Sequence, residues 1–238
     1  MELSPDPLAR PRWHSAALLT IDVQNDFTLA DGAARVAGTE AVIPQIVRLL
    51  DAFRTLRRPI VHVVRFYARD GSDAELSRRT FVQFRGPVVA PETLGAELVA
   101  ALKPDASVRL DSRMLLAGER QQIGPREWVM YKSRWGAFYR TGLEAWLAEL
   151  GVDTAVVCGC NFPNCPRATL VEASERDLRS VIVRDATSQT HERGLAELTS
   201  FGVSILTTQE TLAALNSADP VAQEHRPLSA SALRSTDL

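Results

Sequence analysis

Thr154-Ala155-Val156-Val157-Cys158-Gly159 is a short apolar, β-branched run that ends in glycine, which predicts a buried strand. The chain continues as Cys160-Asn161-Phe162-Pro163-Asn164, a brief turn, and then as Cys165-Pro166. Proline is well tolerated just inside a helix start, because its missing N–H would have no partner there. The sequence therefore predicts that Cys165 lies at the N-terminus of a helix that follows a buried strand.

That position makes Cys165 a candidate nucleophile. Unpaired N–H groups and the helix dipole favour an anion at a helix start, so the pKa of the thiol is expected to be lowered. A buried cysteine that fills the corner between strand and helix is the alternative, because cysteine is often buried for its apolar character alone. This segment by itself leaves both interpretations open.

The rest of the chain alternates between strand-like and helix-like patterns. Strands are expected at 16–23, 60–64, 128–132, 154–158, 180–184 and 203–206. Helices are expected at 39–56, 74–84, 94–102, 138–150, 166–177, 192–200 and 208–215. Strands that alternate with helices require a parallel sheet covered on both faces. The predicted fold is therefore α/β, a three-layer α/β/α sandwich with a six-stranded, mostly parallel, doubly wound sheet.

The predicted domain spans residues 16–215. Residues 1–15 are expected to form an N-terminal extension, and the polar, proline-bearing residues 216–238 a mobile tail. The segment 105–127 is long and polar, which favours a lid or a subunit contact.

Composition excludes several classes of partner. The 238 residues are 45% hydrophobic and 24% charged, and their net charge of −2 gives no argument for nucleic acid or a membrane surface. No stretch is long and apolar enough to cross a bilayer, and the N-terminus has no apolar core like a secretory signal, so a cytoplasmic location is expected. The three cysteines lie close together and the four histidines are scattered, so we expect neither a disulfide framework nor a metal site, and no cofactor.

Polar residues follow three of the predicted strands. Asp22 lies at the end of the strand expected at 16–23, Lys132 ends the one at 128–132, and Cys165 follows the one at 154–158. Ligands bind beyond the carboxyl ends of strands in doubly wound sheets, so these side chains are expected to converge there. An acid, an ammonium and a thiol suit acyl transfer, in which Asp22 moves the proton, Lys132 favours the thiolate and Cys165 attacks a carbonyl carbon. Backbone N–H groups of Asn161 and Cys165 are the expected oxyanion hole.

These residues resemble the isochorismatase-like cysteine hydrolase superfamily, which includes nicotinamidases, carbamoylsarcosine amidases and ureidoacrylate amidases. The resemblance covers about residues 16–215 and rests on strings in a specific order. They are Ile21-Asp22-Val23-Gln24-Asn25-Asp26-Phe27, then Lys132 with Ala137-Phe138 and Thr141, then Gly159 six residues before Cys165, and Arg184-Asp185-Ala186. The resemblance implies that Asp22, Lys132 and Cys165 form a catalytic triad. It also implies a cis peptide bond between Cys160 and Asn161, and a homodimer or larger homo-oligomer.

The chain departs from the superfamily's pattern at three places, one of which is the segment 105–127, longer and more polar than usual. Nicotinamidases carry metal-binding Asp and His after the second strand, but Arg65-Phe66-Tyr67-Ala68-Arg69 stands here, which disfavours a metal-dependent nicotinamidase. Many members have a small residue and threonine in the turn where this chain has Asn161-Phe162-Pro163, so the pocket floor is expected to differ.

Five residues near the triad are candidates for substrate binding. Phe27, Trp135 and Phe162 are expected to line an apolar pocket, with core packing as the alternative. Gln24 is expected either to orient Asp22 or to bind a substrate amide, and Arg167 either to reach the substrate or to pair with an acid such as Glu172.

The resulting hypothesis is a metal-independent amidohydrolase. It would cleave a C–N bond of a small amide, cyclic amide (lactam) or ureide through a thioester. One alternative is isochorismatase-type vinyl-ether hydrolysis that relies on Asp22. Another is a non-catalytic binding or redox-sensing protein that uses the cysteines.

Overall fold

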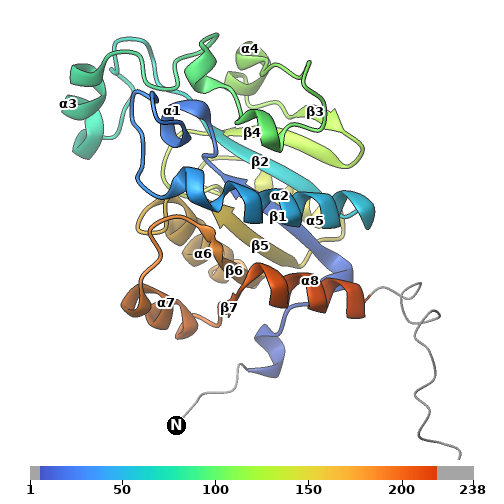
Figure 1. Ribbon diagram of the computed structural model, residues 1–238. Helices are drawn as coiled ribbons and strands as arrows, with labels where there is room; N and C mark the ends of the chain where they lie inside the picture. Colours follow the sequence, from blue (N-terminus) through green and yellow to red (C-terminus); the bar gives the residue numbers. More distant parts are fainter. Residues whose placement is uncertain (1–5, 219–238) are drawn as a thin grey trace, which may run out of the picture.

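A seven-stranded sheet forms the centre of the computed structural model, which describes residues 6–218 (Figure 1). Its strand order is β3-β4-β2-β1-β5-β6-β7, and every neighbouring pair is parallel except β3 and β4. The strands are β1 (Ala16–Ile21), β2 (Ile60–Arg65), β3 (Gln121–Gly124), β4 (Glu127–Lys132), β5 (Thr154–Gly159), β6 (Arg179–Thr187) and β7 (Ser204–Leu206). On one side of β1 lie β2 and β4, with β3 at the edge, and on its other side lie β5, β6 and β7. The direction in which the chain adds strands therefore reverses between β1 and β5.

Helices cover both faces of the sheet, as the predicted three-layer sandwich requires. The α-helices are α1 (Asn25–Thr28), α2 (Thr39–Thr55), α3 (Leu76–Arg85), α4 (Ser112–Leu116), α5 (Leu143–Glu149), α6 (Cys165–Ser174), α7 (Glu192–Thr199) and α8 (Thr208–Ser217). Short 3-10 helices lie at Pro7–Ala9, Trp13–Ser15, Leu94–Ala96 and Ala100–Leu102. Helices α2 and α8 cover one face, and α5, α6 and α7 the other (Figure 1).

Side chains of β1 show how the strands build two cores. Ala17, Leu19 and Ile21 pack towards α5 and α6, while Ala16 and Leu18 pack towards α2. All six residues of β1 are buried, as expected for a strand covered on both faces. The continuous apolar runs in the sequence therefore reflect burial on two sides.

The structure corrects the predicted elements in several places. The sheet has seven strands instead of six, because the polar residues of β3 pair antiparallel with β4 at the sheet edge. The helix expected at 94–102 is two short 3-10 turns, and the helix expected from residue 138 begins only at Leu143. Helix α8 continues to Ser217, so it includes the first residues of the expected tail. The rest of that tail, residues 219–238, lies outside the described residues, as do residues 1–5 of the N-terminal extension.

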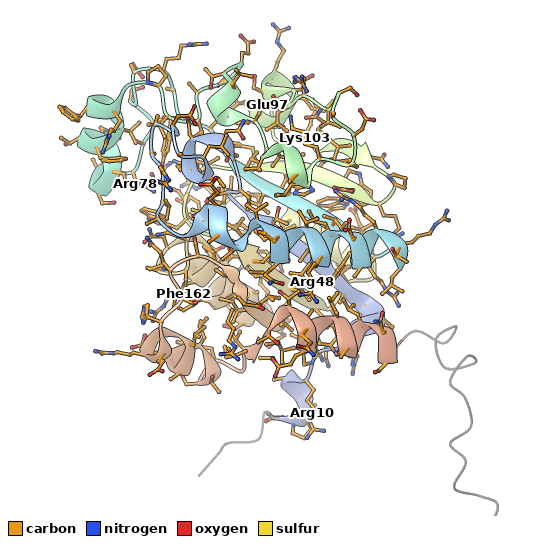
Figure 2. The ribbon with its side chains drawn as sticks, viewed as in Figure 1. Arg10, Arg48, Arg78, Glu97, Lys103 and Phe162 are labelled. Carbon is orange, nitrogen blue, oxygen red and sulfur yellow. The ribbon has the colours of Figure 1, made fainter. Side chains whose placement is uncertain are left out.

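Buried ion pairs cross-link the fold away from the ends of the central strands. Glu127, at the start of β4, accepts hydrogen bonds from Arg54 Nε (2.9 Å) and lies 2.8 Å from His62 Nε2. Lys103 Nζ lies 2.6 Å from Glu97 Oε2 in a second, partly buried pair, labelled in Figure 2. In residues 6–218 no helix is long and apolar enough to span a membrane.

We expect Glu127→Gln to destabilise the protein at neutral pH. Burial alone would raise the pKa of Glu127, but hydrogen bonds from Arg54 and His62 outweigh it and hold the pKa at about 2. A carboxylate whose folded pKa lies below its unfolded value stabilises the protein above the unfolded pKa, and this contribution disappears as pH falls towards the folded pKa. The difference in unfolding free energy between wild type and variant should be about 3 kcal/mol at pH 7 and shrink between about pH 5 and pH 2.

Urea unfolding followed by circular dichroism at several pH values measures this difference. Glu144→Gln is the matched control, because Glu144 also pairs with an arginine, Arg176, but is 64% exposed. An exposed pair contributes little, so this variant should stay within about 0.5 kcal/mol of wild type. A pH-independent deficit in Glu127→Gln would contradict the prediction.

Candidate active site

The three polar residues predicted at strand ends surround the point where the strand order reverses. Asp22 directly follows β1, Lys132 is the last residue of β4, and Cys165 is the first residue of α6, after β5. Crevices at such a reversal are the usual ligand sites of doubly wound sheets. The helix start expected at Cys165 is confirmed.

Backbone contacts between the end of β1 and the end of β5 bring the parts of the site close together. Asp22 adopts a left-handed conformation with φ 52°, so the chain turns immediately after the buried strand. Across from it, Cys160 N–H donates to the Ile21 carbonyl at 2.8 Å. Gly159 has φ 117°, and a Cβ there would lie 2.4 Å from the Ile21 carbonyl oxygen. Only glycine permits this approach, which places the turn before Cys165 against the end of β1.

Lys132 joins the other two side chains. Its Nζ lies 2.8 Å from Asp22 Oδ2 and 3.3 Å from Cys165 Sγ, and it donates to the Arg134 carbonyl at 3.2 Å. The three residues are buried, and Cys165 keeps 7% of its surface exposed. A carboxylate, an ammonium and a thiol from distant parts of the chain are therefore in direct contact.

Protonation at this site is governed by burial and by the neighbouring charges. Burial disfavours the Lys132 ammonium, but Asp22 and Cys165 outweigh that effect and raise the pKa of Lys132 above its ordinary value. Burial raises the pKa of the Cys165 thiol, and the Asp22 carboxylate raises it further, against the opposite effect of Lys132. The lowered pKa expected from the helix start is therefore wrong, because the thiol is buried next to a carboxylate.

One carboxylate oxygen at the site is free to accept a proton. Asp22 Oδ2 is bound to Lys132, whereas Oδ1 is buried and has no hydrogen-bond partner among the described residues. A buried acceptor without a partner is costly in a folded protein. Asp22 Oδ1 can accept a hydrogen bond from a thiol, an amide or a water that enters the site.

The predicted oxyanion donors lie in the turn before α6. Cys160 and Phe162 donate their N–H groups to Ile21 and Ser188, respectively, whereas neither Asn161 N–H nor Cys165 N–H has a partner within residues 6–218. The expected cis peptide bond between Cys160 and Asn161 is wrong, since every peptide bond in that range is trans. A trans bond avoids the roughly 3 kcal/mol that a non-proline cis bond costs.

A loop after β4 is attached to the helix that carries Cys165. Ala137 N–H donates to Thr169 Oγ1 at 3.1 Å, and Phe138 N–H donates to Glu172 Oε2 at 2.9 Å. A Cβ at Gly136 would lie 2.0 Å from Glu172 Oε2, so this glycine permits the contact. The loop that follows Lys132 is thus attached to α6 one to two turns beyond Cys165.

Gln24 supports the backbone around the site. Its side chain is fully buried, donates to the carbonyls of Arg65 and Ala96, and accepts the Arg65 N–H at 2.8 Å. Both ends of the amide are therefore used within the protein. This arrangement favours a positioning role for Gln24 over the predicted contact with a substrate amide.

The predicted aromatic residues divide between core and site rim. Phe27 is buried in a cluster beneath α3, and Phe162 is fully buried, with its ring centroid 5.4 Å from that of His191. Both arrangements favour the core alternative. Trp135 is partly exposed and lines a surface hollow of about 510 Å³ with Asn164 and Arg167, next to the start of α6. Arg167 forms an ion pair with Glu197 and not with Glu172.

Arg65 occupies the end of β2, where the nicotinamidase pattern has metal ligands. It is buried, its guanidinium lies 3.1 Å from Glu75 Oε1, and it donates to the Lys132 carbonyl at 3.2 Å. A cation here does not suit a metal site. No group of three His, Cys, Asp or Glu side chains in the described chain could hold a metal ion.

The Arg65–Glu75 pair was not identified from the sequence. The guanidinium also lies 4.4 Å from the centre of the Tyr67 ring, and the Tyr67 hydroxyl donates to Glu75 Oε2 at 3.0 Å. The available signal was the charge of Arg65 at the end of an otherwise apolar strand. Its partner could not be foreseen, because the pattern that predicts a helix at 74–84 does not say which strand end that helix lies against.

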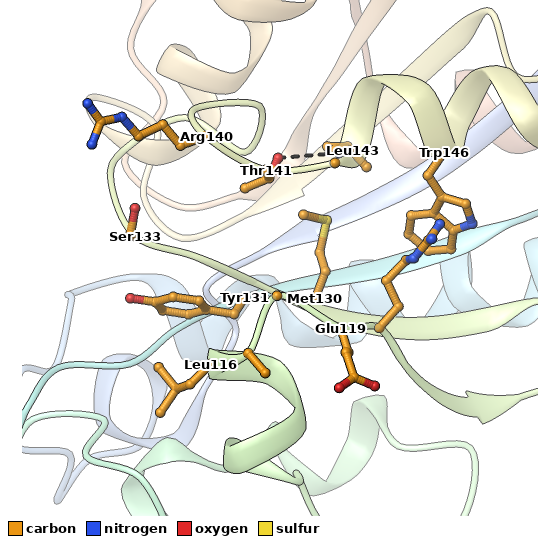
Figure 3. A pocket seen from close by; sticks show the side chains of 13 residues that line it. Leu116, Glu119, Met130, Tyr131, Ser133, Arg140, Thr141, Leu143 and Trp146 are labelled. Atoms are coloured by element: carbon orange, nitrogen blue, oxygen red, sulfur yellow. Dashed lines mark hydrogen bonds between the residues drawn. The ribbon is translucent and has the colours of Figure 1, made fainter.

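A separate hollow of about 350 Å³ lies at the β4 edge of the sheet (Figure 3). Met130, Tyr131, Arg140 and Trp146 are among its lining residues, and the triad is not. The segment 105–127 borders this hollow through residues 116–120, at the end of α4. In this chain that segment therefore packs along the sheet edge, where β3 also pairs with β4.

The family model described as the Isochorismatase domain matches residues 16–114 and 117–210. A probable inactive nicotinamidase of Arabidopsis thaliana is 31% identical over 206 residues, which cover 84% of this chain and 95% of that protein. Maleamate amidohydrolase of Pseudomonas putida is 28% identical over 204 residues, 82% of this chain and 84% of the enzyme. The crystal structure of an isochorismatase family protein from Desulfovibrio vulgaris superposes with a TM-score of 0.71 at 34% identity, covering 84% of this chain and 98% of that one.

Proposed function

Because this chain belongs to the isochorismatase family, we propose that it is a cysteine hydrolase that cleaves a C–N bond of a small amide, cyclic amide or ureide. The observation that carries the proposal is the contact of Lys132 with both Asp22 and Cys165, beside a carboxylate oxygen without a partner. The Pseudomonas relative is named as an amidohydrolase, which supports this chemistry. The plant relative is named as probably inactive, but the intact constellation of acid, ammonium and thiol favours an active enzyme here.

The first half of the proposed reaction forms a thioester. Burial and Asp22 keep the Cys165 thiol protonated at rest, so the proton leaves as sulfur attacks the substrate carbonyl. Asp22 accepts that proton, and the Lys132 ammonium, 3.3 Å from Sγ, stabilises the negative charge that develops on sulfur. The N–H groups of Asn161 and Cys165 bind the oxyanion. Asp22 then protonates the leaving nitrogen, and the C–N bond breaks.

The second half regenerates the enzyme. A water gives its proton to Asp22 and attacks the thioester carbonyl, and the second oxyanion uses the same backbone donors. The C–S bond breaks, sulfur recovers the proton from Asp22, and the carboxylic acid leaves. Each step uses side chains already in contact, so we propose that the reaction needs no metal ion.

Two further expectations remain predictions. A cytoplasmic location and self-association were inferred from the sequence and its resemblance. Large apolar side chains on α3 support self-association, since Leu76 and Phe84 are 84% and 87% exposed. Light scattering of the purified protein measures its oligomeric state.

We expect a covalent acyl adduct on Cys165 when the protein meets an amide that it cleaves. Attack by sulfur on an open-chain amide or ureide releases the amine or ammonia and retains the acyl group, so the protein's mass should rise by that of the acyl group minus one hydrogen. A lactam opens and keeps its amine, so the mass should then rise by that of the whole lactam. Acid quenching of a panel of amides, lactams and ureides, followed by intact-mass and peptide spectrometry, locates the adduct. Ammonia release gives turnover for the primary amides and ureides of the panel, and mass spectrometry of the hydrolysis product gives it for the lactams and N-substituted amides.

Iodoacetamide provides the comparison among the three free cysteines. Cys158 and Cys160 are 0% and 3% exposed and neither contacts an ammonium, whereas Cys165 is 7% exposed and contacts Lys132. Alkylation should therefore favour Cys165. Equal labelling of all three, together with no turnover on the whole panel, would contradict the proposal and favour the non-catalytic alternative.

A further inference from the structure

Arg78, on α3, is a half-buried cation whose guanidinium has no ion pair or hydrogen bond in the part of the chain that the structure describes. Its Cζ lies 5.5 Å from the centre of the Trp135 ring and 5.7 Å from that of Phe81. Figure 2 shows Arg78 on the side of α3 that faces the body of the protein. A half-buried arginine held between aromatic rings has lost part of its hydration without gaining an anionic partner.

The charge of Arg78 acts on the residues around the site. Burial raises the pKa of Tyr67 to about 12, and Arg65 and Arg78 oppose that rise. Burial also raises the pKa of Cys160 to about 12, again with Arg78 in opposition. Tyr67 follows β2, and Cys160 immediately precedes the proposed oxyanion donor Asn161. The geometry agrees with this, because Arg78 contacts Trp135, which follows the end of β4 and lines a hollow with Asn164 just before Cys165.

Carboxylates near Arg78 are already occupied. Glu75 raises the pKa of Tyr67, which Arg78 lowers, and it is already paired with Arg65 at 3.1 Å. Asp22 raises the pKa of Cys160, which Arg78 lowers, and it is already paired with Lys132 at 2.8 Å. The guanidinium of Arg78 itself thus has no carboxylate partner among the described residues, so it can attract and orient an anionic ligand.

We propose that Arg78 binds a carboxylate of the substrate, and that the enzyme acts on amides that carry this second, anionic group. The inference rests on the proposed amide hydrolysis and narrows its substrate class. Trp135 lies between Arg78 and the turn before Cys165, since its ring contacts Arg78 and its side chain lines a hollow with Asn164. The indole offers a flat apolar face for the part of the substrate between the carboxylate and the amide.

The test compares matched substrates on three proteins. The substrates are malonamate, succinamate, glutaramate and adipamate, each next to its neutral diamide. The proteins are wild type, Arg78→Gln and Arg85→Gln. Arg85 lies on the same helix and also faces the Phe81 ring, but it is exposed and has no contact with Trp135, so its variant removes an equal charge away from the site. Calorimetry with the matching dicarboxylates measures binding without hydrolysis.

We expect wild type to prefer the anionic member of at least one pair in kcat/KM. Arg78→Gln should lower kcat/KM for that substrate about 10- to 100-fold, as expected for the loss of a charge-assisted hydrogen bond, and change the diamide less than about twofold. Arg85→Gln should change neither. Preference for every diamide, or equal losses in both variants, would overturn the proposal.

The binding measurements separate this proposal from the hydrolase proposal. Tighter dicarboxylate binding to wild type than to Arg78→Gln, with no amide cleaved, would support the anion site and contradict hydrolysis. Cleavage of diamides with no Arg78-dependent binding of any dicarboxylate would support hydrolysis and overturn the anion site. If no amide is cleaved and no dicarboxylate binds in a way that depends on Arg78, both proposals are contradicted.

Discussion

Cys165→Ala is expected to abolish amide hydrolysis and leave the fold intact. The substitution removes the atom that would form the thioester, and no other thiol contacts Lys132 or Asp22 in residues 6–218. Loss of a nucleophile costs at least about 10³-fold in kcat, which exceeds the effect of any binding residue considered above. The side chain becomes smaller by one buried sulfur, so the free energy of unfolding should fall by only about 1 kcal/mol.

Cys158→Ala is the matched control for this loss. Cys158 is fully buried and packs in the core beneath α2, on the opposite face of the sheet from Cys165. It should lose a similar amount of stability and keep kcat within about threefold of wild type. Ammonia release from the best amide of the panel, measured at saturating substrate for all three proteins, makes the comparison. Amide cleavage by Cys165→Ala at wild-type rate would contradict a thioester route.

The same variant distinguishes the isochorismatase alternative. Vinyl-ether hydrolysis requires a proton donor, and Asp22 can supply the proton without a thiol. Cys165→Ala would therefore keep an ether-cleaving activity if that were the native reaction. Assay of wild type and variant with isochorismate decides between the two chemistries, because the amidase proposal expects no isochorismate cleavage by either protein.

Strand β5 shows why so much of the fold could be predicted. Its bounds, Thr154–Gly159, coincide with an apolar, β-branched run that ends in Gly159, a position where only glycine fits. Parallel strands buried on both faces need such apolar runs, so the strand can be recognised from the local sequence without knowledge of its partners. Asp22 and Lys132 could be identified for a related reason, since each charge interrupts an apolar run at a strand end.

Features that depend on partners far away in the chain could not be predicted. Strand β3 is polar and short, and it exists because β4 offers a free edge. The thiol pKa was misjudged because the helix start is a local signal, whereas burial and Asp22 are properties of the assembled site. Arg78 lies in a segment whose helix could be read, yet only the structure shows that its charge has no partner.

Lys132→Met is expected to destabilise the protein strongly and to abolish hydrolysis. Methionine fills most of the lysine volume but leaves the Asp22 carboxylate buried without its ammonium partner. Removing one member of a buried ion pair costs about 3–5 kcal/mol, because an uncompensated charge remains. Guanidinium unfolding should report this loss, and kcat should fall at least about 10³-fold because no cation remains to stabilise the thiolate.

The double variant Asp22→Asn/Lys132→Met separates structural from chemical roles. With both charges gone, no ion is left buried alone, so at least half of the lost unfolding free energy should return. Activity should not return with it, because the proton acceptor and the cation are both absent. Lys103→Met is the control: Lys103 pairs with Glu97 at 2.6 Å in a partly buried setting away from the site, so its loss should destabilise the protein, though less than Lys132→Met, and spare kcat. Recovery of hydrolysis in the double variant would instead show that the pair serves only the fold, and the proton transfer assigned to Asp22 would have to be abandoned.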